Sequence, residues 1–429
     1  MNIVARNLFL ADLIKLISIK SFTGDEHGIK SCFELVAEIA HRFGFQTKMC
    51  AKGKVLEVYP KDLTRRIKLG IITHIDTVPF DERDWNFNPM GERSEERIYG
   101  RGTIDDKMGV LYSLYVMKEL EGQIIPSWKL IIGSSEEGRW VDMEEYQREK
   151  NVIPEFLFTI DGDGIQNGCR GLLNLELEFT RKEDSEKFIQ MFDTTNVTAN
   201  VIPDIVYTNV DGTMRSFIGK AAHSSNPELG KNAICMAYDV YREALEEEFP
   251  GFAKLMQNYI TGEEGSSIFI RKYRKEYGIY EMPGTTVAPT ICRLEGDKLR
   301  LTLNVRVSPA ITEKCKLYES FFKISQNYEC HVKILDFIMP AFIDFENSEI
   351  KLMQNAYEKV MGRRPKPNIA LGTGYNAAFE NAAIFGPRFD EVDEKEEDLC
   401  HGANESRSIE DIVKFYDILI EYIKNSLSK

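Results

Sequence analysis

The sequence predicts an α/β protein in which a mainly parallel central sheet is interrupted by an inserted α+β domain. Strand-like and helix-like runs alternate up to about residue 160 and return from about residue 345, which is typical of parallel strands joined by helices. Residues 172–180 instead alternate apolar and polar side chains, as a strand with one solvent-facing side does. Because 429 residues exceed what one hydrophobic core usually supports, we expect two domains, one formed by 1–173 and 339–429 and the other by 174–338.

The spacing of apolar residues predicts the elements of the first domain. Apolar side chains recur with a helical period in two N-terminal segments, in the segment after Asp105-Asp106-Lys107 and at the C-terminus. Short runs rich in Ile, Leu and Val, bounded by turn residues, predict buried strands. The expected helices are 8–20, 27–43, 108–121 and 408–427, and the expected strands are 54–59, 67–73, 128–134 and 156–160.

The inserted domain is predicted from strands that have one polar face and are accompanied by a few helices. The expected strands are 172–180, 204–210, 214–219, 286–293, 299–307 and 330–337, and the expected helices are 183–192, 232–248 and 312–326.

Composition excludes several classes of partner. The chain is 43% hydrophobic, and no apolar run reaches the roughly 18 residues that span a membrane, so we expect no membrane partner. The net charge is −14 without a dominant basic cluster, which argues against nucleic acid. The N-terminus lacks the pattern of a cleaved signal, and the eight cysteines are scattered without a CxxC pair. These features predict a cytoplasmic protein with reduced thiols.

Acidic and histidine side chains follow the predicted strands at the points where the strands end. His74 and Asp76 come at the end of the strand 67–73, and strand alternation places them on the same face. The carboxyl ends of strands in an open α/β sheet are where such folds usually bind their ligands. A carboxylate beside an imidazole can fix the imidazole's tautomer and orientation, but the short His-x-Asp pattern alone favours a surface histidine near an unrelated acid.

Four further sites continue this pattern. Asp105 stands in the glycine-rich turn Gly100-Arg101-Gly102-Thr103-Ile104-Asp105-Asp106-Lys107, and the other acids and the imidazole are Glu136, Glu137, Asp161 and His401. Carboxylates mixed with imidazoles suit Zn²⁺, with Mn²⁺ or Co²⁺ as substitutes. Cys400 precedes His401, but without a CxxC partner we interpret it as a small buried residue rather than as a ligand.

These motifs, in this order, are similar to those of the di-zinc exopeptidase family that contains glutamate carboxypeptidase, succinyl-diaminopimelate desuccinylase and aminoacylase. The resemblance covers nearly the whole chain. The positions of Trp85, Trp140 and Tyr146, with the context of Asp161, resemble the bacterial dipeptidase V-like branch of Xaa-His and β-Ala-Xaa dipeptidases. The fold that this resemblance implies is a zinc-exopeptidase-like catalytic domain with an inserted lid.

The resemblance also implies two Zn²⁺ ions per subunit. Asp105 would bridge the ions, and the remaining ligands would be His74 and Asp161 at one ion and Glu137 and His401 at the other. Glu136 would be the general base and then the proton donor, and Asp76 would orient His74. The stretch Asp161-Gly162-Asp163-Gly164 departs from the branch's usual sequence, so Asp163 remains a rival of Asp161 as a ligand.

Three residues of the inserted lid match the family's substrate-binding positions. Asn200, in an Asn-x-x-Pro motif, would reach the substrate, and His223 would help to stabilise the oxyanion. Arg306 would bind the substrate carboxylate, for which a bidentate guanidinium is suited. Without the resemblance, the residues alone favour His223 as a turn residue before the helix at 232 and Arg306 as a charge on a strand surface.

The resemblance therefore implies a metal-dependent dipeptidase that acts on short peptides. An amidohydrolase acting on N-acyl amino acids, of the desuccinylase or deacetylase type, is the alternative with the same chemistry. An inactive binding homologue is the alternative from another class, and the intact set of ligands with Glu136 argues against it. The sequence leaves the substrate side chains open, and it leaves the oligomeric state open between monomer and homodimer.

Overall fold

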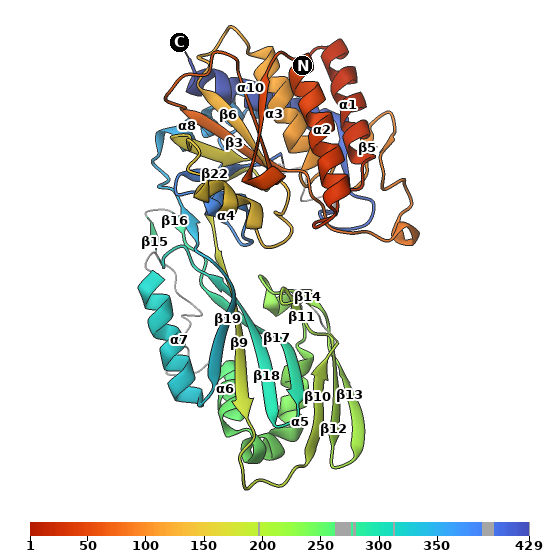
Figure 1. Cartoon of the computed structure of the whole chain (residues 1–429), viewed down its shortest axis with the longest axis vertical. Coiled ribbons are helices and arrows are strands. Elements are labelled where there is room, and N and C mark those ends of the chain that lie inside the picture. The colour runs from red at the N-terminus through yellow and green to blue at the C-terminus, as the bar shows by residue number, and fades with distance from the viewer. Residues whose placement is uncertain (196–197, 262–275, 278–279, 312–313, 388–398, 429) are drawn as a thin grey trace. The chain divides into compact units, whose positions relative to one another are not determined.

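The computed structural model describes residues 1–195, 198–261, 276–277, 280–311, 314–387 and 399–428. Contacts within the chain divide it into two compact units (Figure 1). The first unit consists of Met1–Gly168, Ala341–Ala370 and Gly374–Lys429, and the second consists of Cys169–Pro340 and Leu371–Thr373.

The first unit is built on a nine-stranded sheet whose centre is parallel. The strands follow one another across the sheet in the order β1 (Gln46–Cys50), β2 (Val55–Tyr59), β6 (Trp128–Gly133), β3 (Leu69–His74), β7 (Phe156–Thr159), β22 (Ala382–Phe385), β8 (Ile165–Cys169) and β20 (Ala341–Phe342), while β21 (Asn368–Ala370) pairs with β8. The four strands β6, β3, β7 and β22 run parallel, and β1, β2 and β8 pair antiparallel with their neighbours. The mixed α/β fold with a mostly parallel central sheet is therefore as the sequence predicts.

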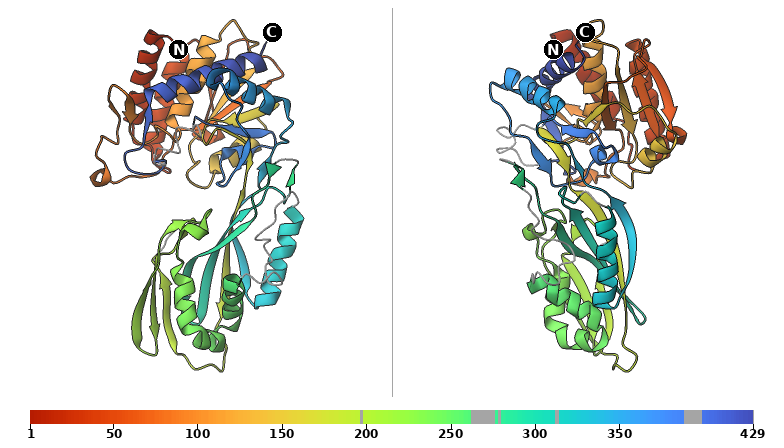
Figure 2. Two further views of the ribbon diagram at one scale, coloured as in Figure 1. Left: turned by 180° about the vertical axis from the view of Figure 1, so that it is seen from behind. Right: turned by 90° about the vertical axis from the view of Figure 1, so that its left-hand side faces the viewer.

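The two central strands β3 and β6 are buried along their whole length. Such strands are covered on both faces, which explains why their sequences read as nearly continuous apolar runs. One face packs against a layer of helices that shares the main core with the sheet, namely α1 (Ile3–Ile17), α2 (Glu26–Arg42), α3 (Lys107–Glu119), α8 (Ser348–Met361) and α10 (Ile409–Ser426) (Figures 1 and 2). The short helix α4 (Val141–Arg148) instead contacts β2, where Tyr146 joins the buried ion pair of Lys129 with Glu57. A small sheet of β4 (Glu92–Arg93), β5 (Arg97–Tyr99) and β23 (Ser406–Ser408) completes the unit.

The second unit has an antiparallel sheet with its own hydrophobic core. This sheet has the order β17 (Thr286–Glu295), β18 (Lys298–Val307), β9 (Gly171–Thr180) and β19 (His331–Ile338). The remaining elements are a second sheet of β10 (Ile189–Thr194), β12 (Ile205–Val210) and β13 (Thr213–Ile218), the pairs β11 (Val201–Ile202) with β14 (Ala222–His223) and β15 (Glu276–Tyr277) with β16 (Tyr280–Glu281), and the helices α5 (Ala233–Glu248), α6 (Pro250–Thr261) and α7 (Lys314–Tyr328).

One predicted element of the second unit is wrong. No helix forms at 183–192, where the strand β10 begins at Ile189. The buried carboxylate of Glu248 accepts hydrogen bonds of 2.8 Å from the backbone N–H groups of Phe188 and Ile189. These bonds, together with pairing to β12, hold the segment extended against its local helix propensity. Within the described residues, no helix is both long and apolar enough to cross a membrane.

Candidate active site

The structure gathers seven of the predicted site residues at one edge of the central sheet. His74 is the last residue of β3, Asp76 lies two residues later, Glu136 and Glu137 follow β6, and Asp161 follows β7. Because β6, β3 and β7 are parallel neighbours, their carboxyl ends meet at this edge. Asp105 comes from the turn before α3, and His401 comes from the loop before β23.

Asp105 lies between the two imidazoles. Its Oδ1 is 2.7 Å from Nε2 of His74, and its Oδ2 is 2.8 Å from Nε2 of His401. Nε2 of His401 is also 2.8 Å from Oε1 of Glu137, and Nε2 of His74 is 3.9 Å from Oδ2 of Asp161. One carboxylate therefore faces two separate sets of donor atoms, as a carboxylate that bridges two ions does.

Asp76 supports this cluster from behind. Its backbone carbonyl lies 3.0 Å from Nδ1 of His74, and its Oδ1 lies 3.3 Å from the same nitrogen. Its carboxylate also accepts the backbone N–H groups of Glu136 and Glu137 at 3.2 Å and the Thr23 hydroxyl at 2.7 Å. Asp76 therefore fixes the end of β3 and the first turn after β6 together, and Nε2 of His74 is left to face the other acids.

The cluster holds more negative charge than its own groups balance. Burial raises the pKa of Glu136 and of Glu137, and the charge of Asp161 raises that of Glu136 further. Burial and the charge of Asp105 raise the pKa of Asp161 to about 8. Burial opposes the ionisation of Asp105 too, but hydrogen bonds with the two imidazoles lower its pKa. Buried carboxylates in such numbers call for cations, and the mixed oxygen and nitrogen donors suit zinc-like divalent ions.

The donor atoms separate into two groups, each suited to one ion. His74, Glu136 and Asp161 each offer one atom within 4.8 Å of the others, and so do Asp105, Cys400 and His401. Oε1 of Glu137 is buried and makes no hydrogen bond, although it lies close to His401. A cation would satisfy this oxygen.

Asp161 and Asp163 differ in their surroundings. Asp161 contributes an oxygen to the group with His74, whereas the side chain of Asp163 is exposed. Of the two rivals, the arrangement favours Asp161 as a ligand.

Two residues that hold the site escaped the sequence analysis. Glu405 is fully buried, and its carboxylate accepts the backbone N–H groups of Gly102 at 3.1 Å and Ile104 at 2.6 Å and an N–H of Arg101 at 2.5 Å. Burial raises the pKa of Glu405 to about 7, against the opposing charge of Arg101. The other residue, Thr23, stands in the break between the first two helices. Neither lies at a strand end, and the only available signal was that Glu405 follows closely after the late histidine.

Two further predicted residues lie together within the second unit. Asn200 directly precedes β11, and His223 ends β14, which pairs with β11 through Val201. The backbone carbonyl of Asn200 accepts the Ser224 N–H at 2.8 Å. Nδ1 of His223 accepts the Ser225 backbone N–H at 3.2 Å, which favours the tautomer with its proton on Nε2. Both predicted side chains are exposed.

Arg306, the third predicted residue of the second unit, is buried within β18. One terminal nitrogen donates to the Thr373 hydroxyl at 3.1 Å, while Nε is buried without a hydrogen-bond partner. Burial and the neighbouring positive charge of Arg170 lower its pKa to about 10. Arg170 is itself held by carbonyl groups, including that of Ser225 at 2.8 Å. Two buried guanidinium groups beside each other favour an anion at Arg306.

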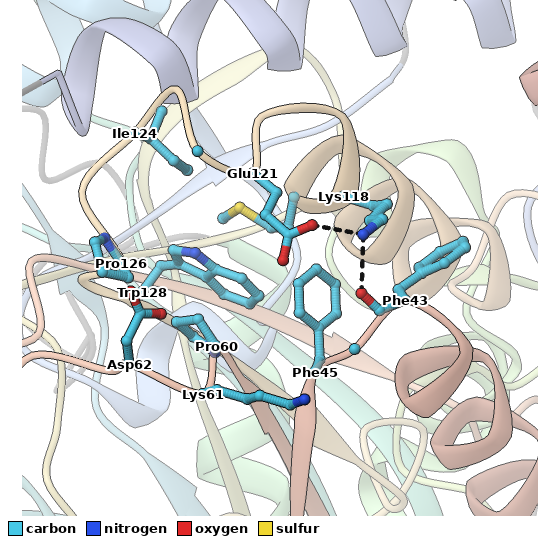
Figure 3. Close-up of a pocket in the computed structure, with 13 residues that line it drawn as sticks. Phe43, Phe45, Pro60, Lys61, Asp62, Lys118, Glu121, Ile124, Pro126 and Trp128 are labelled. Atoms are coloured by element: carbon cyan, nitrogen blue, oxygen red, sulfur yellow. Dashed lines mark hydrogen bonds and ion pairs between the residues drawn. The ribbon is translucent and has the colours of Figure 1, made fainter.

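A separate pocket of about 470 Å³ lies at the other ends of the strands (Figure 3). It is lined by Phe45 before β1, by Pro60 after β2 and by Trp128 at the start of β6. In the wall of the pocket, Nζ of Lys118 donates to the Phe43 carbonyl at 3.1 Å. None of the predicted site residues lines this pocket, so it is distinct from the acidic cluster.

Comparison with known proteins places the chain in a family. The model of peptidase family M20/M25/M40 matches residues 70–425, which span the strand ends described above. The chain belongs to this family. The β-Ala-Xaa dipeptidase of Lactobacillus delbrueckii subsp. lactis is 25% identical over 400 residues, which cover 83% of this chain and 81% of that protein.

Solved structures show the same fold. The aminoacylhistidine dipeptidase of Vibrio alginolyticus matches with a TM-score of 0.65 at 12% identity, covering 100% of this chain and 98% of that chain. A dipeptidase of Saccharomyces cerevisiae matches with a TM-score of 0.64 at 14% identity, covering 98% and 96%. The predicted resemblance is confirmed, and membership of the family makes the chain a metal-dependent peptidase.

Proposed function

We propose that this chain is a dipeptidase in which two divalent cations, Zn²⁺ in the first instance, lie on either side of Asp105. The observation that carries the proposal is the Asp105 carboxylate, whose two oxygens face His74 and His401 at 2.7 and 2.8 Å. His74 and Asp161 would hold one ion, and Glu137 and His401 would hold the other. Bound cations of this kind lower the pKa of a water molecule and polarise a carbonyl group.

Glu136 is the general base of the proposed reaction. Its carboxylate lies in the same group of donor atoms as His74 and Asp161, and its backbone is fixed by Asp76. Glu136 takes a proton from the attacking water and returns it to the amine of the leaving amino acid. Because both transfers use one carboxylate, that side chain must reach the water and the scissile bond from a fixed position.

The second unit is proposed to recognise the substrate as a lid. Arg306 would bind the carboxylate at the C-terminal end of the peptide, a role that its buried and unpaired Nε supports. His223 would donate its Nε2–H to the oxyanion, and Asn200 would contact the substrate beside it. The dipeptidase substrate class is supported by the name of the Lactobacillus relative, which is similar over most of both chains.

Glu136→Gln tests the proposal directly. The amide keeps the shape of the side chain but cannot accept the proton, so hydrolysis of dipeptides such as β-Ala-Xaa should fall by about 10²–10⁴-fold. The metal content per protein chain, measured by inductively coupled plasma mass spectrometry, should stay at the wild-type level. Glu144→Gln, an exposed position on α4, is the matched control and should leave both quantities unchanged. Full activity of metal-loaded Glu136→Gln would overturn the assignment.

A substrate panel tests the class of substrate. Dipeptides with a free amine should be hydrolysed faster than N-acetyl or N-succinyl amino acids at equal concentration. The opposite preference would replace the dipeptidase with an amidohydrolase of N-acyl amino acids, and it would leave the role of Glu136 intact.

A further inference from the structure

Cys400 lies beside the acidic cluster rather than in an apolar core. Its Sγ lies 3.5 Å from Oδ2 of Asp105, the oxygen that also faces His401. Asp105, Cys400 and His401 each offer one donor atom, and these atoms lie within 4.8 Å of one another. The side chain is half-buried, so the interpretation of Cys400 as a small buried residue accounts for neither its exposure nor its neighbours.

The backbone directs two successive side chains to the same place. Cys400 and His401 lie in a turn, where the alternation of side chains along a strand does not apply, and His401 has a φ of 63°, in the left-handed region. A hydrogen bond stabilises this turn, because Arg101 donates to the His401 carbonyl at 2.9 Å. The same Arg101 pairs with buried Glu405. The thiol therefore faces Asp105 because of an anchored loop.

The spacing of the sulfur and the oxygen suits a shared ion. Two ligands on one tetrahedral Zn²⁺, with bonds of about 2.3 Å to sulfur and about 2.0 Å to oxygen, lie about 3.5 Å apart. Sγ of Cys400 and Oδ2 of Asp105 have this separation.

A second observation points to an ion at the same place. Oε1 of Glu137 is buried without a hydrogen bond, and its side chain is 8% exposed. It lies 2.8 Å from Nε2 of His401, and the same nitrogen lies 2.8 Å from Oδ2 of Asp105. The unpaired carboxylate oxygen, the imidazole, the second carboxylate and the thiol thus converge from four residues.

We infer that Cys400 is a thiolate ligand of the ion held by Asp105, Glu137 and His401. The inference deepens the proposed function, because it rests on the two-metal site. On coordination a sulfur–metal bond forms, and the S–H proton leaves to solvent. A soft sulfur donor makes this ion site selective for Zn²⁺, Cd²⁺ and Co²⁺ over Mn²⁺. The ion beside His74 and Asp161 keeps only oxygen and nitrogen donors, so the two sites differ in metal preference.

Cobalt spectroscopy of the full-length protein tests the inference without using activity. After removal of bound metal with a chelator, the wild type is titrated with Co²⁺. We expect visible d–d bands and, in addition, a near-ultraviolet band from sulfur-to-cobalt charge transfer. Cys400→Ser should lose the near-ultraviolet band and keep the visible bands. Cys235→Ser, a half-buried cysteine of α5 in the second unit, is the matched control and should keep both.

Metal affinities give a second readout. Cys400→Ser should bind Cd²⁺ at least about tenfold more weakly, while its affinity for Mn²⁺ should change by less than about threefold. Cys400→Asp, which restores an anionic ligand of the harder kind, should raise the affinity for Mn²⁺. Circular dichroism and thermal melting of each variant show whether the fold is kept.

The outcomes separate this inference from the proposed function. Visible cobalt bands without a charge-transfer band in the wild type, or an unchanged charge-transfer band in Cys400→Ser, would overturn the thiolate ligand alone. Failure of the wild type to bind any Co²⁺ would overturn the metal site itself.

Discussion

The acidic cluster of the first unit and the predicted binding residues of the second unit are built in opposite ways. His74 and Asp76 are fully buried, and each is fixed by contacts to its neighbours. Asn200 and His223 are exposed and stand on a pair of two-residue strands. In the proposed reaction, the first unit would supply a preorganised reaction centre, whereas the second would present groups that a substrate orders when it binds.

Arg306 departs from this contrast. It belongs to the second unit but is buried near the end of a long strand, next to another buried arginine. A buried guanidinium with an unpaired nitrogen keeps its position before the substrate arrives. We therefore expect recognition of the carboxylate to depend on a rigid group, and stabilisation of the oxyanion to depend on an exposed one.

Asp105→Asn should have the largest effect, because it removes the charge that both imidazoles face. We expect dipeptide hydrolysis to fall by more than about 10³-fold, and metal content to fall with it, since a neutral amide cannot bridge two cations. Activity and metal stoichiometry measured on the same sample check both parts. Asp163→Asn, at an exposed position nearby, should change neither. A normal metal content in Asp105→Asn would refute the bridging role.

His223→Ala should distinguish the role of the second unit from that of the acidic cluster, because it should lower kcat without removing metal. Loss of one oxyanion donor typically lowers kcat by about 10²–10³-fold, and we expect this loss with no change in bound metal. Steady-state kinetics and metal analysis provide the two readouts. His331→Ala, an exposed histidine on β19 in the same unit, is the control. If His223→Ala loses metal instead, the residue belongs to the reaction centre and the contrast fails.

Arg306→Lys should have the smallest effect, confined to binding. Lysine keeps the charge but cannot bind a carboxylate through two N–H groups, so KM should rise about tenfold, which is about 1.4 kcal/mol, with kcat nearly constant. A dipeptide with an amidated C-terminus is the control substrate, because wild type and variant should hydrolyse it equally slowly. An equal loss on both substrates would show that Arg306 acts structurally.

The sequence predicts the strand ends of the first unit well, because buried parallel strands carry a strong apolar signal. His74, Glu136 and Asp161 follow such runs directly, so their meeting at one edge is a consequence of topology. The helix expected at 183–192 is wrong because the structure of this segment depends on a distant residue rather than on a local signal. The conformation of the segment depends on Glu248, a residue of α5 whose carboxylate accepts the backbone N–H groups of Phe188 and Ile189.

The same limit applies to the supporting residues of the site. Thr23 bonds to Asp76 across 53 positions, and Glu405 bonds to Ile104 across 301 positions. Local patterns carry no information on such pairs, because each acts only once the chain has folded. The left-handed backbone of His401, in the turn that also places Cys400 beside Asp105, is equally hard to predict from a sequence without a glycine at that position.

The bonds of Glu405 have a consequence for how the protein matures in the cell. The backbone N–H groups of the turn that carries Asp105 stay unpaired until Glu405, 300 to 303 residues later in the sequence, accepts them. Until Glu405 has left the ribosomal exit tunnel, this turn lacks its anchor. We therefore expect a nascent chain to bind metal at this site only after Glu405 has emerged from the ribosome.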